Sequence, residues 1–187
     1  MQDWKSVARD PSLTGRVGLE LPLLPFTVPR SALGARAKAA GAFFLGEIMP
    51  SDPAIRDILK SVKTIALVGW SPRADRPSHG VAAYLSGRGY RVIPVNPGQA
   101  GVTTPWGEVV RASLSEISDE VDMVDIFRRS AEVGPVVDEA LSHLRGLKVI
   151  WMQLGVVNEA AAARAEAAGL QVVMNRCPAI EIPRLGL

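Results

Sequence analysis

Cysteine is scarce in this 187-residue chain, in which Cys177 is the only one. A single cysteine excludes an internal disulfide framework. It is also typical of proteins in a reducing compartment, so we expect a cytoplasmic location. No stretch of the chain approaches the roughly 18 consecutive apolar residues that a membrane-spanning helix requires. We therefore expect no membrane partner.

An excess of positive charge is missing from most of the chain. The net charge is +2, and residues 1–48 carry six basic and four acidic side chains, whereas residues 49–187 carry fifteen of each. Proteins that bind a nucleic-acid backbone usually present a basic surface on the folded body. We therefore expect no nucleic-acid partner.

Patterns that hold metals or catalyse reactions are also lacking. The two histidines, His79 and His143, are isolated and have no neighbouring Cys or His at the spacing of a zinc site. The chain has no G-x-S-x-G nucleophile elbow and no Walker A sequence. We expect no metal ion and no catalytic residues, so that the chain binds a ligand without transforming it.

The first 48 residues differ in composition from the rest. They contain four prolines and five glycines, which interrupt any regular element. We expect residues 1–48 to be a poorly ordered or non-native extension, with Met49 as an alternative start, and residues 49–187 to form one domain.

From residue 50 onward, short apolar segments alternate with helical ones. This alternation predicts an α/β fold, a Rossmann-like doubly wound parallel sheet of five or six strands in a single domain. Helices are expected from Pro53 and over residues 80–86, 130–143 and 159–168. Strands are expected at residues 64–68, 90–95, 121–127, 147–152 and 170–174, with a short additional strand at 108–112.

The turn that follows the first strand is the strongest candidate for a ligand site. It reads Gly69-Trp-Ser-Pro-Arg-Ala-Asp-Arg-Pro-Ser78 and leads into a helix that we expect Ser78 to cap. Exposed N–H groups and a helix N-terminus favour an anion there. Arg73 and Arg76 add cations that suit phosphate.

Other candidates follow the remaining strands, because ligands of such sheets bind beyond the carboxyl ends of the strands. Arg128 and Arg129 follow one strand directly and are expected either to contact the ligand or to pair with Asp125. The full candidate set for binding is Gly69, Trp70, Ser71, Arg76, Pro77, Ser78, Asn96, Pro97, Phe127, Arg128, Arg129 and Gln153.

The common dinucleotide pattern does not fit this turn. A Trp and a Pro occupy a turn that is longer than G-x-G-x-x-G allows, and Asn96-Pro97 stands where an acidic residue would bind the ribose of NAD. The sequence therefore argues against NAD, although an NAD(P)-linked oxidoreductase stays open as an alternative.

Several blocks of the sequence together resemble the small stand-alone CoA-binding proteins, which are similar to the CoA-binding N-terminal domain of the succinyl-CoA synthetase α subunit. The likeness covers about residues 52–185 and rests on Val68–Ser71, Arg76–Ser78, Gly89–Pro97, Val124–Ser130, Trp151–Gly155 and Arg176–Pro178.

The resemblance implies that coenzyme A, or an acyl-CoA, is the ligand. The diphosphate would meet the turn at residues 69–78, adenosine would lie near Asn96-Pro97, and Phe127 to Arg129 would form the opposite wall. Cys177 is then either a small buried residue or a thiol near the pantetheine end. A partner protein or a second copy of the chain is also expected, as in an accessory subunit of an acyl-CoA ligase.

Overall fold

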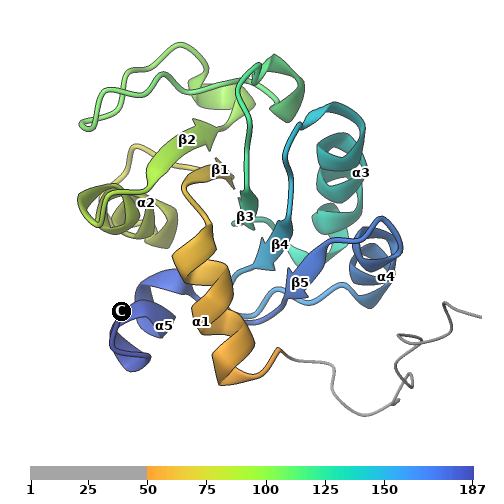
Figure 1. Ribbon diagram of the computed structural model, residues 1–187. Helices are drawn as coiled ribbons and strands as arrows, with labels where there is room; N and C mark the ends of the chain where they lie inside the picture. The colour runs from red at the N-terminus through yellow and green to blue at the C-terminus, as the bar shows by residue number, and fades with distance from the viewer. Residues whose placement is uncertain (1–49) are drawn as a thin grey trace, which may run out of the picture. The chain divides into compact units, whose positions relative to one another are not determined.

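The computed structural model describes residues 50–187, and the expectations for residues 1–48 lie outside this range. The described residues form an α/β fold around one sheet of five parallel strands in the order β2-β1-β3-β4-β5 (Figure 1). The strands are β1 (Thr64–Val68), β2 (Arg91–Val95), β3 (Met123–Ile126), β4 (Val149–Met152) and β5 (Gln171–Val173). The predicted Rossmann-like parallel sheet is confirmed.

Helices cover both faces of the sheet. Figure 1 shows α3 and α4 together on one side and α1, α2 and α5 on the other. The helices are α1 (Asp52–Ser61), α2 (Pro77–Gly87), α3 (Val133–His143), α4 (Glu159–Ala167) and α5 (Pro178–Arg184), with 3₁₀ turns η1 (Pro97–Gln99), η2 (Leu114–Glu116) and η3 (Ser130–Glu132). None of the helices in residues 50–187 is both long and apolar enough to cross a membrane.

A hydrophobic core lies on each face of the sheet, and alternate residues of each strand point into one core or the other. Both faces are buried, which explains why the strands are unbroken apolar runs in the sequence. On β1, Ile65 and Leu67 pack with α1, α2 and α5, whereas Ala66 and Val68 pack in the core beneath α3 and α4. At about 25 cal/mol per Å² of buried apolar surface, these two layers are the main source of stability.

The expected additional strand at residues 108–112 is wrong. This segment makes only isolated bridges, Val95 with Arg111 and Thr103 with Val109. Arg111 donates to the Pro94 carbonyl and accepts from Asn96, but Pro94 has no N–H with which to continue the ladder. The sheet therefore ends at β2.

Helix α5 was not expected from the sequence, because Pro178 and Pro183 resemble breaks. Pro178 occupies the first turn, where a missing N–H costs nothing. Ile182 and Leu185 are buried against the sheet, and Arg184 bonds to Asp52 of α1. Burial and this ion pair hold the helix despite Pro183 inside it.

The strand order places the switch point of the sheet between β1 and β3. The crossover from β1 runs through α2 on one face, and the crossover from β3 runs through α3 on the other face. A crevice opens beyond the carboxyl ends of strands at such a point. The candidate site lies there.

Candidate functional site

Gly69 directly follows β1, and the turn after β3 packs closely against it. Its φ is +91°, and a Cβ placed on it would lie 2.4 Å from the Phe127 carbonyl oxygen. The Phe127 N–H donates to the Val68 carbonyl at 2.8 Å, and the Gly69 N–H donates to Val95 at 2.9 Å. Only glycine fits both the left-handed conformation and this approach.

The Trp70 side chain belongs to the core. It is 1% exposed, lies edge-on to Trp106 and stacks on His79, with ring centroids 6.2 and 6.1 Å away. The Asn96 amide donates to the Trp70 carbonyl at 2.6 Å and accepts from the Gly98 N–H at 2.9 Å. Asn96 thus joins the turns after β1 and β2.

The start of α2 differs from the expectation. Arg76 holds the N-cap position without a side-chain cap bond, and Pro77 is the first helical residue. Ser78 lies within the first turn and is 5% exposed, so its expected role as the cap is wrong. The helix begins earlier because Pro at its first position is already fixed near helical φ.

Side chains of the turn itself are mostly open to solvent. Arg73 pairs with Asp75 at 2.8 Å, and the Ser71 hydroxyl accepts from the Arg73 N–H at 3.3 Å. The exposed Arg76 guanidinium has no ion-pair partner within residues 50–187. It is therefore available to an anion.

A small cavity, the switch-point cavity, opens beside Gly69 and has a volume of about 160 Å³. Polar groups meet on its wall, because Arg128 approaches from the end of β3 and Glu139 from α3. Its lining residues are Val68, Gly69, Val95, Asn96, Pro97, Ala112, Ser113, Leu114, Arg128, Val136 and Glu139.

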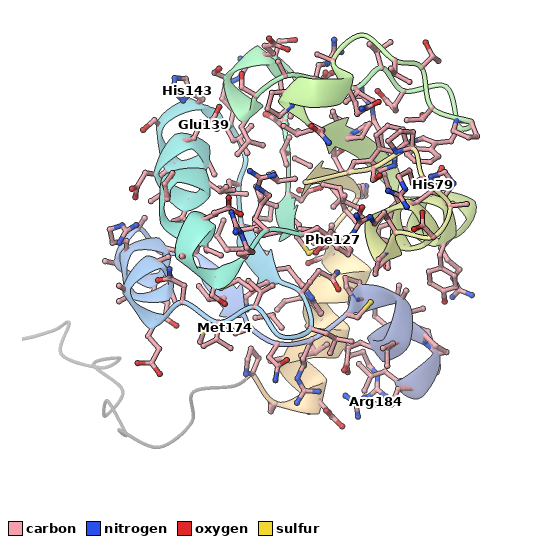
Figure 2. The ribbon with its side chains drawn as sticks, turned by 180° about the vertical axis from the view of Figure 1, so that it is seen from behind. His79, Phe127, Glu139, His143, Met174 and Arg184 are labelled. Carbon is pink, nitrogen blue, oxygen red and sulfur yellow. The ribbon has the colours of Figure 1, made fainter. Side chains whose placement is uncertain are left out.

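A larger cavity, the apolar cavity, has a volume of about 680 Å³ and lies beyond the ends of β3 and β4. Phe127, which lines it, lies near the middle of Figure 2, with His79 and Glu139 to either side. The lining residues are Pro77, Val81, Phe127, Arg128, Arg129, Gln153, Leu154, Val156, Cys177, Ala179 and Ile180. Arg128 borders both cavities.

The two arginines after β3 share one acidic partner. Arg129 bonds to Glu132 at 3.0 Å, and Arg128 lies 3.6 Å from the same carboxylate. The alternative prediction, an ion pair with Asp125, is wrong. Asp125 lies within β3, and its side chain is fully buried there. Both guanidinium groups stay partly exposed, so they can exchange this partner for phosphate.

Asp125 is fully buried and is held by a single side chain. The Gln153 amide nitrogen donates to its two carboxylate oxygens at 2.9 and 3.1 Å. Burial raises the pKa of Asp125 to about 7, and the hydrogen bond from Gln153 only partly opposes this rise. The interior therefore favours the protonated carboxyl.

Cys177 is a free thiol that precedes α5 and lines the apolar cavity. Burial raises the pKa of its thiol; backbone N–H groups at the start of α5 and the Gln153 side chain lower it in part. Within residues 50–187, no three His, Cys, Asp or Glu side chains gather in a way that suits a metal ion.

The structure thus divides the predicted set of site residues. Neither cavity is lined by Trp70, Ser71, Arg76 or Ser78, whereas the other predicted residues all line one or both. Among the lining residues missing from the predicted set are Val81, Glu139, Leu154, Ala179 and Ile180. Their common signal was weak, because four of these five lie on helices, including the unexpected α5, and only Leu154 lies in a turn shortly after a strand.

The fold and the crevice define a doubly wound α/β protein with two adjoining cavities at the carboxyl edge of its sheet. Residues 63–183 match the family model described as CoA binding domain. The chain belongs to this CoA-binding family, as the sequence resemblance indicated.

Known proteins share much of the chain. It is similar to the uncharacterized protein YneT of Bacillus subtilis (strain 168), at 39% identity over 128 residues, 68% of this chain and 91% of that protein. It is similar to a solved hypothetical protein from Pyrococcus horikoshii OT3, with 38% identity, a TM-score of 0.68 and coverage of 74% and 94%.

A larger enzyme contains a similar unit. The dinucleotide-forming acetyl-coenzyme A synthetase 1 of Ca. Korarchaeum cryptofilum, solved with phosphate and ADP, is 25% identical with a TM-score of 0.51. The match covers 59% of this chain but only 25% of the synthetase. The fold therefore occurs both alone and as one part of an enzyme.

Replacing Gly69 by Ala is expected to lower the free energy of unfolding by about 1–3 kcal/mol or more, because it adds backbone strain and a clash with Phe127. Urea unfolding measures this loss. Gly80→Ala is the matched control: its Cβ would meet nothing within 4 Å inside α2. It should stabilise the protein by roughly 0.5–1 kcal/mol. Equal stability of Gly69→Ala and the wild type would contradict the close approach.

Asp125 should give the free energy of unfolding a distinctive pH dependence. The folded protein keeps the Asp125 proton up to about pH 7, whereas the unfolded chain releases it near the ordinary pKa of 3.8. Stability from this group therefore falls as the pH rises between these values. Relative to Asp125→Asn, the wild type should lose stability from pH 4 to 7 in urea titrations.

Asp122→Asn is the control with the opposite sign. Burial of Asp122 acts to raise its pKa, but bonds from Lys148 and from the Thr64 and Lys63 N–H groups lower it overall. The stability that Asp122 provides is therefore lost as the pH falls through its lowered pKa. If the wild type and Asp125→Asn show parallel pH profiles, Asp125 does not hold its proton in the folded state.

Proposed function

We propose that the chain binds coenzyme A or an acyl-CoA across the carboxyl edge of its sheet, without catalysing a reaction on it. The observation that carries the proposal is the position of Arg128, which borders both the switch-point cavity and the apolar cavity. CoA has the same order of parts: a polar nucleotide, a diphosphate and a mainly apolar arm.

The diphosphate would lie between the turn after β1 and the turn after β3. Gly69 places no side chain at this point, and Arg128 and Arg129 supply guanidinium groups from the cavity wall. Arg76, at the N-cap of α2, would reach the diphosphate from the exposed turn. Arginine suits this role because its planar fork donates two hydrogen bonds to one phosphate. The first turn of α2, which Pro77 begins, adds its positive end.

The adenosine would occupy the switch-point cavity. Asn96 and Pro97, near which the resemblance implies that adenosine lies, form one wall of this cavity. Glu139 gives this cavity an acceptor for N–H or O–H groups, so the 3′-phosphate on the ribose of CoA would have to point out of the cavity, away from this carboxylate. The base and ribose fit these demands better than the diphosphate does.

The pantetheine arm would enter the apolar cavity. Its lining includes Val81, Phe127, Leu154 and Ile180, and the last two are 57% and 50% exposed. Exposed apolar side chains around a cavity favour an occupant that covers them. An acyl group on the thiol would extend the same contact.

A second candidate is an accessory subunit that completes an acyl-CoA ligase. The similar unit within the acetyl-coenzyme A synthetase supports it, because that unit is one part of a longer chain. An NAD(P)-linked oxidoreductase is the less favoured alternative, since the turn after β1 lacks the dinucleotide pattern. Cytoplasmic location and a protein partner or second copy belong to the same proposal.

Arg128→Ala is expected to weaken CoA binding about 10- to 100-fold, since a charge-assisted hydrogen bond is worth roughly 1.5–3 kcal/mol. Arg76→Ala should weaken it in the same direction. Calorimetric titration gives the Kd. Thermal shift with CoA, 3′-dephospho-CoA, NAD and ATP ranks the ligands, because a ligand of the folded state raises stability as RT ln(1 + [L]/Kd).

Lys60→Ala provides the control, because Lys60 is an exposed cation on α1, which precedes β1 at the opposite edge of the sheet. It should leave the Kd for CoA unchanged. A larger thermal shift with NAD than with CoA would favour the oxidoreductase. An unchanged Kd in Arg128→Ala would refute the placement of the diphosphate.

A further inference from the structure

Three neighbouring strands bring polar groups together at one wall of the apolar cavity. Asp125 lies on β3, Gln153 directly follows β4, and Cys177 comes after β5. Gln153 and Cys177 both line the cavity, and Asp125 lies behind Gln153 in the core. The proposed function, as described so far, uses neither the thiol nor the buried acid.

Gln153 presents a free acceptor at this wall. The residue is 5% exposed, and its amide nitrogen donates to Asp125. Its carbonyl oxygen receives no hydrogen bond from residues 50–187 and is not sealed from solvent. This oxygen can therefore accept from an N–H donor of an occupant of the cavity.

A pantetheine arm supplies such a donor, because it contains two amide N–H groups and ends in a thiol. An amide N–H on the Gln153 oxygen would bring the end of the arm to the wall that Cys177 shares. Asp125 fixes the Gln153 amide, so the oxygen has a set direction before the ligand arrives.

We propose, on the basis of the proposed function, that Cys177 forms a reversible mixed disulfide with CoA. In the step that we propose, the Cys177 thiolate attacks one sulfur of CoA disulfide. The S–S bond of CoA disulfide breaks, a Cys177–CoA disulfide forms, and one CoA leaves as a thiolate that takes up the proton released by Cys177. One disulfide is consumed and one is formed, so no further oxidant is needed.

Selectivity would come from binding and not from an activated thiol. Cys177 is 5% exposed, and burial disfavours its thiolate, so small disulfides free in solution should react slowly. A ligand held in the cavity raises the local concentration of its sulfur beside the thiol. The site should therefore prefer CoA disulfide over other disulfides.

Intact-protein mass spectrometry of the full chain tests this directly, because Cys177 is the only cysteine. The chain is incubated with CoA disulfide, with glutathione disulfide or with the disulfide of pantetheine alone. We expect one CoA per chain, released by dithiothreitol, and formed at least about tenfold faster than the glutathione adduct. Desulfo-CoA, which has no thiol to react, should slow the CoA adduct by occupying the site.

Variants separate the reaction at Cys177 from the contact that Gln153 makes with the ligand. Cys177→Ser should lose the adduct and keep the thermal shift with CoA. Gln153→Ala should slow the adduct, whereas Gln171→Ala, at an exposed glutamine on β5, should not. The protection by desulfo-CoA needs no variant, so the test stands even if Gln153→Ala fails to fold.

Equal rates with CoA and glutathione disulfides, or no protection by desulfo-CoA, would overturn the thiol exchange. So would the absence of an adduct in a chain whose melting temperature CoA still raises; the proposed function would survive that result. If CoA disulfide forms no adduct and CoA does not shift the melting temperature, both the exchange and the proposed function fail.

Discussion

The close approach of two turns at Gly69 is the constraint on which the rest of the crevice depends. The Phe127 carbonyl oxygen occupies the space where any other residue would place its Cβ. Because the turns after β1 and β3 meet there, Arg128 reaches the crevice from one side while the start of α2 faces it from the other. A side chain at position 69 would force these two walls apart.

Charged and apolar groups lie in different parts of the crevice. Arg128 and Arg129 share Glu132, which offsets only one of their two positive charges, so one remains for an anion. On the far side, Asp125 and Gln153 form a polar pair behind an apolar wall. A ligand with an anionic middle and an amide-bearing arm would match both halves, which supports the proposal of CoA over a dinucleotide.

Prediction from sequence worked where a pattern is local. The five strands of the sheet were found from their apolar runs. Asn96, Arg128 and Gln153 were named as candidates because they come just after strands, and all three line a cavity at the carboxyl edge. Prediction failed where a distant partner decides the outcome. Helix α5 survives Pro183 because the sheet buries Ile182. Residues 108–112 fail as a strand because Pro94, next to their bridge partner Val95, has no N–H to extend the pairing.

The sequence by itself determined the class of fold and which residues follow the strands at the carboxyl edge of the sheet, because strand runs and their flanking residues are encoded locally. Only the tertiary structure decided that Trp70 and Ser78 turn inward, that Glu132 and not Asp125 pairs with the arginines, and that Cys177 meets Gln153 at one cavity. These outcomes depend on which segments the parallel strands bring side by side. Contacts between residues far apart in the chain leave no local pattern in the sequence from which they could be predicted.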